Sequence, residues 1–178
     1  MSELGAAAYD GTLERTLDGG VIRFERHLRY PIGEVWDAIT NPARLAEWWL
    51  PVEADITIDL QAGGQMVIAP RDEGAATITC TILRVEAPVL LEHTHLDGTS
   101  YLRWELEPRD NACVLRLAHF VTDIAGAIDR SYVAGLHVSL ARLAPYLAGH
   151  PVAWDWDVFA QARARYASVG RASPDVGA

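Results

Sequence analysis

Histidine is the residue type in this chain best suited to acid–base or metal chemistry, and His93 and His95 stand two positions apart in a strand-like segment. Side chains two positions apart on a strand point to the same face of a sheet, so this alternation places both imidazoles beside Leu91. The same reasoning places His119 on the apolar face of a later strand-like segment. If these faces are the inward ones, three imidazoles reach one cavity, and His137, on the helical segment that follows, is a fourth candidate.

Two kinds of site fit such histidines. His-x-His on one strand can supply two metal ligands, and His119 could then complete a tetrahedral zinc site with one open position. The alternative is a wet pocket in which His93, His95 and His119 hydrogen-bond to a ligand, to water or to one another. Because this spacing permits a metal without requiring one, we favour ligand-orienting histidines and expect neither a metal nor an organic cofactor.

A catalytic acid or base would come from the same set of residues. Histidine titrates near neutral pH, so His119 or His95 could take this role, as could Tyr132 or Arg26. No Gly-x-Ser-x-Gly motif, phosphate-binding loop or dinucleotide fingerprint supports another reaction. Catalysis would require these groups to lie close together in a dry pocket, and we therefore favour a binding protein over an enzyme.

Tryptophans and the long helical segment supply the candidate apolar walls. Trp36, Trp48, Trp49 and Trp104 could grip an aromatic or aliphatic ligand at a pocket mouth, although core packing is the favoured interpretation for Trp36 and Trp104. Trp48 and Trp49 are adjacent, so a helix cannot point both inward, and one of them is a candidate gate. The candidate ligand-binding residues are thus Trp36, Trp48, Trp49, His93, His95, Trp104, His119, Tyr132, Leu136, His137 and Leu140.

The composition limits the class of protein. A chain of 178 residues with 50% hydrophobic and 22% charged residues suits one globular domain. Its net charge of -9 comes without clustered cations, which argues against a phosphate-backbone partner, so no nucleic acid is expected. All 15 basic residues are Arg, and the absence of Lys excludes Schiff-base chemistry on a lysine.

Cysteine usage and the N-terminal sequence bear on the cellular compartment. Cys80 and Cys113 are far apart in the sequence and lack metal-type spacing, so we expect no disulfide and a reducing, cytoplasmic setting. The N-terminus lacks the basic start and apolar run of a signal peptide. No stretch approaches the ~20 apolar residues that span a bilayer, so no membrane partner is expected.

The rest of the chain supplies the elements that would position these side chains. Residues 21–28 alternate apolar and polar side chains, as half-buried strands do, and Asp18-Gly19-Gly20 before them permits a tight reversal. Residues 127–148 switch to helical spacing and end at Gly149. The full prediction is strands at 12–17 and 21–28, short helices beginning at Pro31 and Asn41, six hairpin-linked antiparallel strands between 54 and 123, a long helix at 127–148 and a tail helix at 155–168.

This order of elements, together with several short strings, resembles the helix-grip fold of the START-like, or SRPBCC, superfamily. Within it the chain is similar to the bacterial single-domain branch named for activators of the heat-shock protein 90 ATPase, in the same broad group as polyketide cyclases and birch-pollen-allergen relatives. Two departures are Gly135-Leu136, where the family usually has Gly-Trp, and His93 or His95, where it usually has an aromatic. The matching strings, within residues 11–149, are Ile22-Arg23-Phe24-Glu25-Arg26, Glu34-Val35-Trp36-Asp37-Ala38, Leu45-Ala46-Glu47-Trp48-Trp49, Arg103-Trp104-Glu105-Leu106-Glu107-Pro108, Leu115-Arg116-Leu117-Ala118-His119 and Gly135-Leu136.

The resemblance implies an α+β helix-grip architecture. In it a curved antiparallel sheet of about seven strands wraps a long C-terminal helix, with two short helices after the first strand and an extra tail helix. Residues 1–10 would form a flexible N-terminus, 11–149 a ligand-binding domain and 150–178 a tail packed on that domain. Trp154 and Trp156 in the tail would mark either an interaction surface or a docking contact, and we favour docking.

The function implied by the resemblance is binding of a small, largely hydrophobic molecule in an internal cavity between sheet and long helix. Such a protein would be a carrier, a sensor or a stress-related binding protein. Two alternatives stay open: a polyketide cyclase/aromatase-like or lyase-type enzyme that uses a cavity histidine as acid or base, and a co-chaperone-like protein-binding module. The expected partner is thus a small hydrophobic molecule; a homodimer stays open and a chaperone partner is disfavoured.

Overall fold

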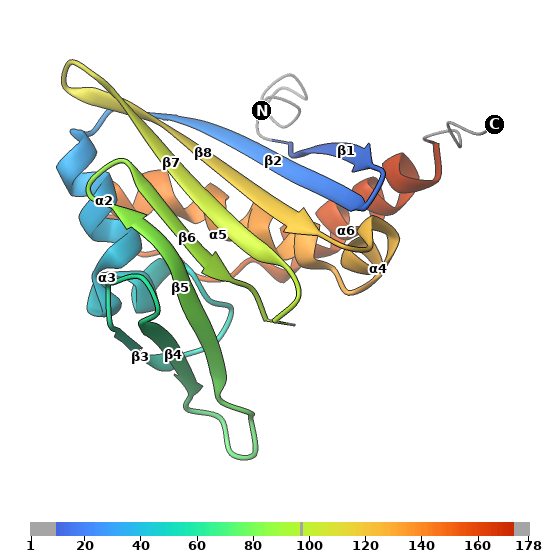
Figure 1. Cartoon of the computed structure of the whole chain (residues 1–178), viewed down its shortest axis with the longest axis horizontal. Coiled ribbons are helices and arrows are strands. Elements are labelled where there is room, and N and C mark those ends of the chain that lie inside the picture. Colours follow the sequence, from blue (N-terminus) through green and yellow to red (C-terminus); the bar gives the residue numbers. More distant parts are fainter. Residues whose placement is uncertain (1–9, 97, 173–178) are drawn as a thin grey trace.

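The computed structural model describes residues 10–96 and 98–172, which form one eight-stranded antiparallel sheet and five helices. Eight strands are the number that the sequence pattern predicts, whereas the resemblance implied about seven, and their order is β1-β2-β8-β7-β6-β5-β4-β3 (Figure 1). Residues 1–9 of the predicted flexible N-terminus lie outside the described residues. The strands are β1 (Thr12–Thr16), β2 (Gly19–Leu28), β3 (Ala54–Ile58), β4 (Gln65–Pro70), β5 (Ile78–Glu86), β6 (Leu90–Thr94), β7 (Tyr101–Arg109) and β8 (Ala112–Val121).

The β1–β2 hairpin turns slightly earlier than the glycines predict. Thr16 already pairs with Gly19, so the turn consists of Leu17 and Asp18. Gly19 has a φ of 140°, and a Cβ there would lie 2.0 Å from the Val121 carbonyl oxygen of β8, so the position requires glycine. From Ile22 to Leu28, β2 shows the predicted alternation, with every second residue buried.

The two short helices begin where the sequence predicts. They are α2 (Ile32–Thr40) and α3 (Pro42–Trp48). Asn41 caps α3, because its side-chain oxygen accepts a hydrogen bond of 3.1 Å from the Ala43 amide. Pro42 fits the first position of the helix, where no intrahelical amide donor is needed.

The predicted long helix at 127–148 is wrong in one respect, because it is two helices. They are α4 (Ile124–Asp129) and α5 (Tyr132–Leu147), separated at Ser131, whose φ of 63° is left-handed. A left-handed residue ends a run of helical backbone, and the apolar spacing gives no sign of it. The tail helix α6 (Trp156–Ala172) follows and packs against α4 and α5.

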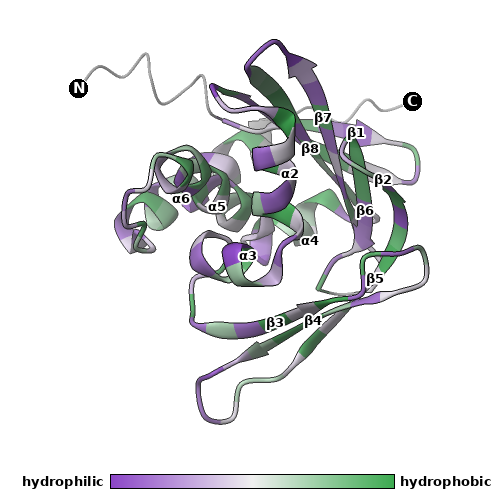
Figure 2. Ribbon diagram, turned by 90° about the vertical axis from the view of Figure 1, so that its left-hand side faces the viewer, coloured by the Kyte–Doolittle hydropathy of each residue, from purple (hydrophilic) through white to green (hydrophobic). Residues whose placement is uncertain are grey.

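All the described helices lie on one side of the sheet, which bends so that β3 and β4 pass beneath α3 (Figure 2). This is the predicted helix-grip arrangement. The core fills the space between the concave sheet face and α2, α3 and α5. Within residues 10–96 and 98–172, no helix combines the length and apolar content needed to cross a membrane.

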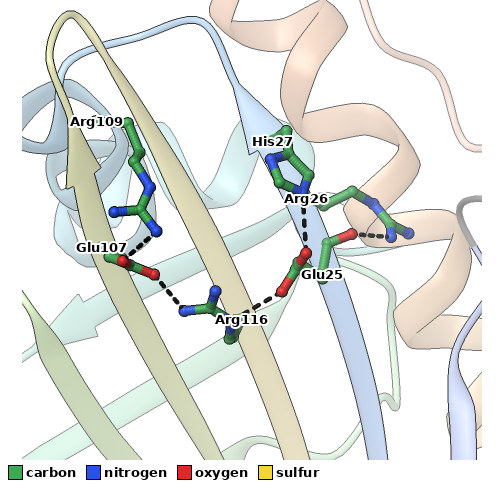
Figure 3. Close-up of polar contacts among 6 residues, drawn as sticks. All are labelled: Glu25, Arg26, His27, Glu107, Arg109 and Arg116. Atoms are coloured by element: carbon green, nitrogen blue, oxygen red, sulfur yellow. Dashed lines mark hydrogen bonds and ion pairs between the residues drawn. The ribbon is translucent and has the colours of Figure 1, made fainter.

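The convex face of the sheet, unlike the apolar concave face, carries charged side chains. Arg116 lies between two carboxylates, with Nε 2.8 Å from Glu25 and Nη1 2.8 Å from Glu107 (Figure 3). His27 and Arg109 extend the row at its two ends. Because these groups are largely exposed, each pair contributes at most about 1 kcal/mol, and the row mainly keeps this face of the sheet polar.

Candidate ligand-binding cavity

A cavity of about 280 Å³ lies between the concave face of β4 to β7 and the first half of α5. On the sheet side, Met66, Ile68 and Leu102 supply apolar walls, since strand alternation turns these side chains inward. On the helix side, Gly135 and Leu136 face the same space. The lining is therefore mostly apolar, as ligand pockets usually are.

His93 lies in the cavity wall with both ring nitrogens already engaged. Its Nδ1 lies 2.9 Å from the Thr94 carbonyl oxygen, which can only accept, so Nδ1 carries the hydrogen. Its Nε2 then accepts the 3.1 Å hydrogen bond that the Trp104 indole donates. Burial also lowers the pKa of His93 to about 4. His93 is thus a neutral, fixed imidazole with no nitrogen left over for a metal or a ligand.

His95, His119 and Tyr132 form a compact group of rings at one end of the cavity. The His95 ring centroid lies 4.4 Å from that of His119 and 4.8 Å from that of Tyr132. His95 and Tyr132 line the cavity, whereas His119 is fully buried behind them, with Nε2 3.0 Å from the Ser100 hydroxyl. The structure thus brings three of the four acid–base candidates together. The fourth, Arg26, lies outside the described cavity lining, and its Nη1 donates a 2.8 Å hydrogen bond to the Glu25 carbonyl oxygen. Within residues 10–96 and 98–172, no three His, Cys, Asp or Glu side chains are placed to hold a metal ion.

The tryptophans divide between core and cavity. Trp48 is fully buried and donates a 2.9 Å hydrogen bond from Nε1 to the Ala38 carbonyl, whereas Trp49 lines the cavity. Trp104 packs between them and His93, with its ring centroid 5.0 Å from that of Trp49. The remaining apolar candidates, Trp36 and Leu140, contribute to the core and not to the cavity lining.

His137 lies on the opposite side of α5 from the cavity. Its Nδ1 is 3.1 Å from the Tyr166 hydroxyl of α6 and 3.7 Å from the Asp10 carboxylate. Burial lowers the pKa of His137 to about 4, and the nearby Asp10 opposes the shift only in part. The same Tyr166 hydroxyl accepts a 2.7 Å hydrogen bond from the Gly11 amide. His137 therefore helps to join α5, α6 and the segment before β1.

Acidification should destabilise the protein through His137. Its pKa falls from 6.5 in the unfolded chain to about 4 in the folded protein, so between these values the unfolded chain binds the extra proton. The stability that the neutral His137 contributes is fully present above pH ~6.5. On going to pH ~4, about 3 kcal/mol of the free energy of unfolding should be lost, since one pKa unit is worth ~1.4 kcal/mol. The free energy of unfolding, measured by urea denaturation at a series of pH values, should fall less on acidification in His137→Asn than in the wild type.

The matched control is His150→Asn, because His150 is an exposed residue in the segment that follows α5. This variant should retain the wild-type pH dependence. An equal loss of the pH dependence of stability in both variants would contradict the role of His137.

Sequence reasoning favoured Trp154 and Trp156 as a docking contact, but it missed Phe159 and did not predict that these residues cover the cavity. Trp154, Trp156 and Phe159, before and within the start of α6, all line it, and their ring centroids lie 5.7 to 5.9 Å apart. Arg142 of α5 holds this segment, because its guanidinium donates 2.8 Å hydrogen bonds to the Leu50 and Val152 carbonyls. Three aromatic residues within six positions are the signal that could have indicated a cover.

A second, larger hollow of about 940 Å³ lies outside this cover, along α3 and β3. Its lining includes charged side chains, among them Glu47, Glu53, Asp55 and Arg71. An apolar molecule would leave these charges desolvated, so the smaller cavity beneath α5 is the better candidate site.

Comparison with known proteins identifies relatives of the same architecture. Residues 29–148 match the family described as Activator of Hsp90 ATPase homolog 1-like protein. CalU16 from Micromonospora echinospora is 23% identical over 90% of this chain and 96% of its own, with a TM-score of 0.69. EF2215 from Enterococcus faecalis, a conserved protein of unknown function, is 18% identical over 94% of both chains, with a TM-score of 0.77. The protein encoded by gene BPP1335 from Bordetella parapertussis is 30% identical over 90% of this chain and 92% of its own, with a TM-score of 0.67.

No protein of curated function matches the chain. The likeness to CalU16 and EF2215 shows the fold alone, which agrees with the helix-grip architecture predicted from the sequence. The family match covers the long helix and most of the sheet, whereas the aromatic cover lies beyond it. The chain belongs to the Activator of Hsp90 ATPase homolog 1-like family, within the SRPBCC superfamily.

Proposed function

We propose that the protein binds a small, largely apolar molecule in the cavity between the sheet and α5, as a carrier or sensor. The observation that carries this proposal is the cavity itself, about 280 Å³ of mostly apolar space between the sheet and α5 that opens beside the exposed Leu96 and Trp156. Drug-sized ligands occupy pockets of ~300 to 1,000 Å³, so the ligand belongs at the small end of that range.

Distinct parts of the lining would have distinct roles in binding. Leu102 and Leu136 would contact the body of the ligand from the sheet and the helix. Trp49 would act as the gate, because it borders the cavity beside the aromatic cover while Trp48 is held in the core. His95 and Tyr132 would orient a polar atom of the ligand, since they are the acid–base candidates that reach the cavity.

N-phenyl-1-naphthylamine, a neutral aromatic probe whose fluorescence rises in apolar surroundings, tests the proposal. The protein should bind it with a saturable, one-to-one titration. The melting temperature should rise with probe concentration, because a ligand that binds only the folded state stabilises it by mass action. A titration without saturation, or an unchanged melting temperature at saturating probe, would refute the proposed binding role.

A cyclase-like enzyme is the second candidate, favoured by the contact between His95, His119 and Tyr132. A histidine there could remove a proton from a carbon beside a carbonyl group, the step that begins ring closure in polyketide-like substrates. Native mass spectrometry of the purified protein separates the two candidates. A retained molecule that is released unchanged supports a carrier, whereas a retained molecule that the protein converts supports an enzyme.

A further inference from the structure

We propose that the ligand carries one anionic group, which Arg130 binds at the mouth of the cavity while the apolar body lies beneath α5. This inference rests on the proposed binding function and adds the chemical class of the ligand. That class is an apolar molecule with a single carboxylate, sulfonate or phosphate group.

The charges around the cavity are the first observation. In the part of the chain that the structure describes, Arg130 is the one Asp, Glu or Arg residue in the lining. The protein as a whole has a net charge of -9, so a cation at this place runs against the overall balance. A neutral ligand would gain nothing from it, whereas an anion would form a charge-assisted contact.

The position of Arg130 is the second observation. It stands between α4 and α5, beside the left-handed Ser131, and it is exposed together with Leu96 and Trp156 of the lining. Leu96 is 47% exposed and Trp156 is 59% exposed, so these residues mark the mouth of the cavity. A ligand that entered with its apolar end first would leave its polar end beside Arg130.

The guanidinium of Arg130 is held in place without an ion pair. Its Cζ lies 5.3 Å from the centroid of the Tyr132 ring, a cation–π contact with a residue that itself lines the cavity. The Asp123 carboxylate is near it in space, since Asp123 Oδ2 and Arg130 Nη1 would lie 2.2 and 3.0 Å from a Cβ built at Gly126. Neither Asp123 nor Asp129 forms an ion pair with Arg130 within 4.0 Å among the residues described. Arg103 and Arg116, by contrast, are paired with glutamates. The guanidinium of Arg130 is thus oriented by Tyr132, and an anionic group at the mouth need not break a direct ion pair to reach it.

Two probes with the same aryl skeleton test the inference. They are N-phenyl-1-naphthylamine, which is neutral, and 1-anilinonaphthalene-8-sulfonate, which adds one anionic group. Fluorescence titrations would give the Kd of both probes for the wild type, Arg130→Gln and Arg163→Gln. Arg163 is an exposed residue of α6 outside the cavity lining and serves as the matched control.

Arg130→Gln should raise the Kd of the sulfonate about fivefold, as expected for one exposed charge contact, and leave the Kd of the neutral probe unchanged. Arg163→Gln should change neither value. The sulfonate should displace the neutral probe from the wild type, because both bind in one cavity. Added salt should reduce the difference in the Kd of the sulfonate between the wild type and Arg130→Gln, since salt screens the charge contact.

The outcomes separate the two proposals. If the neutral probe binds but Arg130→Gln leaves the Kd of the sulfonate unchanged, the anionic ligand class is overturned and the binding function stands. If the sulfonate binds without displacing the neutral probe, the anion site is elsewhere and the inference is likewise overturned. If neither probe binds the wild type, both proposals fail.

Discussion

Replacing Gly135 by Leu should weaken the binding of N-phenyl-1-naphthylamine at least tenfold while leaving the protein as stable as before or more so. Gly135 lies on the inner side of α5 in the cavity lining, and a Cβ built there would meet no atom within 4 Å. A leucine side chain would grow into the cavity of about 280 Å³ and occupy the space that a ligand needs. Helix propensity favours the change by up to ~1 kcal/mol, because glycine loses the most backbone freedom in a helix.

Gly33→Leu is the matched control for this prediction. Gly33 is an exposed residue of α2, and a Cβ there would also meet no atom within 4 Å. It should show a similar change in melting temperature and wild-type probe binding. Wild-type binding by Gly135→Leu would mean that the probe lies outside this cavity, and would count directly against the proposed function.

Trp48→Ala should cost about 3 to 5 kcal/mol in the free energy of unfolding, the largest loss expected of a single substitution here. Trp48 is fully buried, and its ring meets those of Trp49 and Trp104 edge-on at 5.4 and 6.5 Å between centroids. Its indole also donates to the Ala38 carbonyl, whose helical partner four residues later would be Pro42, which has no amide hydrogen. The substitution therefore leaves both a void and an unsatisfied buried carbonyl.

Urea denaturation of Trp48→Ala and Trp156→Ala would measure this difference. Trp156 is 59% exposed, so its removal should cost less than about 1 kcal/mol, as most changes at exposed positions do. Trp48→Phe should fall between the two, because it keeps an aromatic ring but loses the indole donor. Equal losses in the two alanine variants would show that Trp48 is not a central core residue.

Local patterns in the sequence were sufficient for most of the elements. Alternation along β2 and around His93 depends only on the two-residue period of a strand, and the start of α3 depends only on Asn41 and Pro42. The break at Ser131 had no such signal, because its left-handed backbone depends on how α4 and α5 pack against the rest of the fold.

The sequence by itself determined most of the elements and which side chains share a strand face, since both follow from periodicity along the chain. The helix-grip fold class came from the resemblance of its motifs to a known superfamily. Only the tertiary structure decided what each inward side chain does. Trp104, from the neighbouring strand, donates a hydrogen bond to one ring nitrogen of His93. His119 is buried behind His95, and His137 faces α6. Tertiary contacts likewise place Trp154, Trp156 and Phe159 over the cavity. Contacts between residues distant in the sequence set hydrogen-bond partners and burial, and a local pattern carries no record of them.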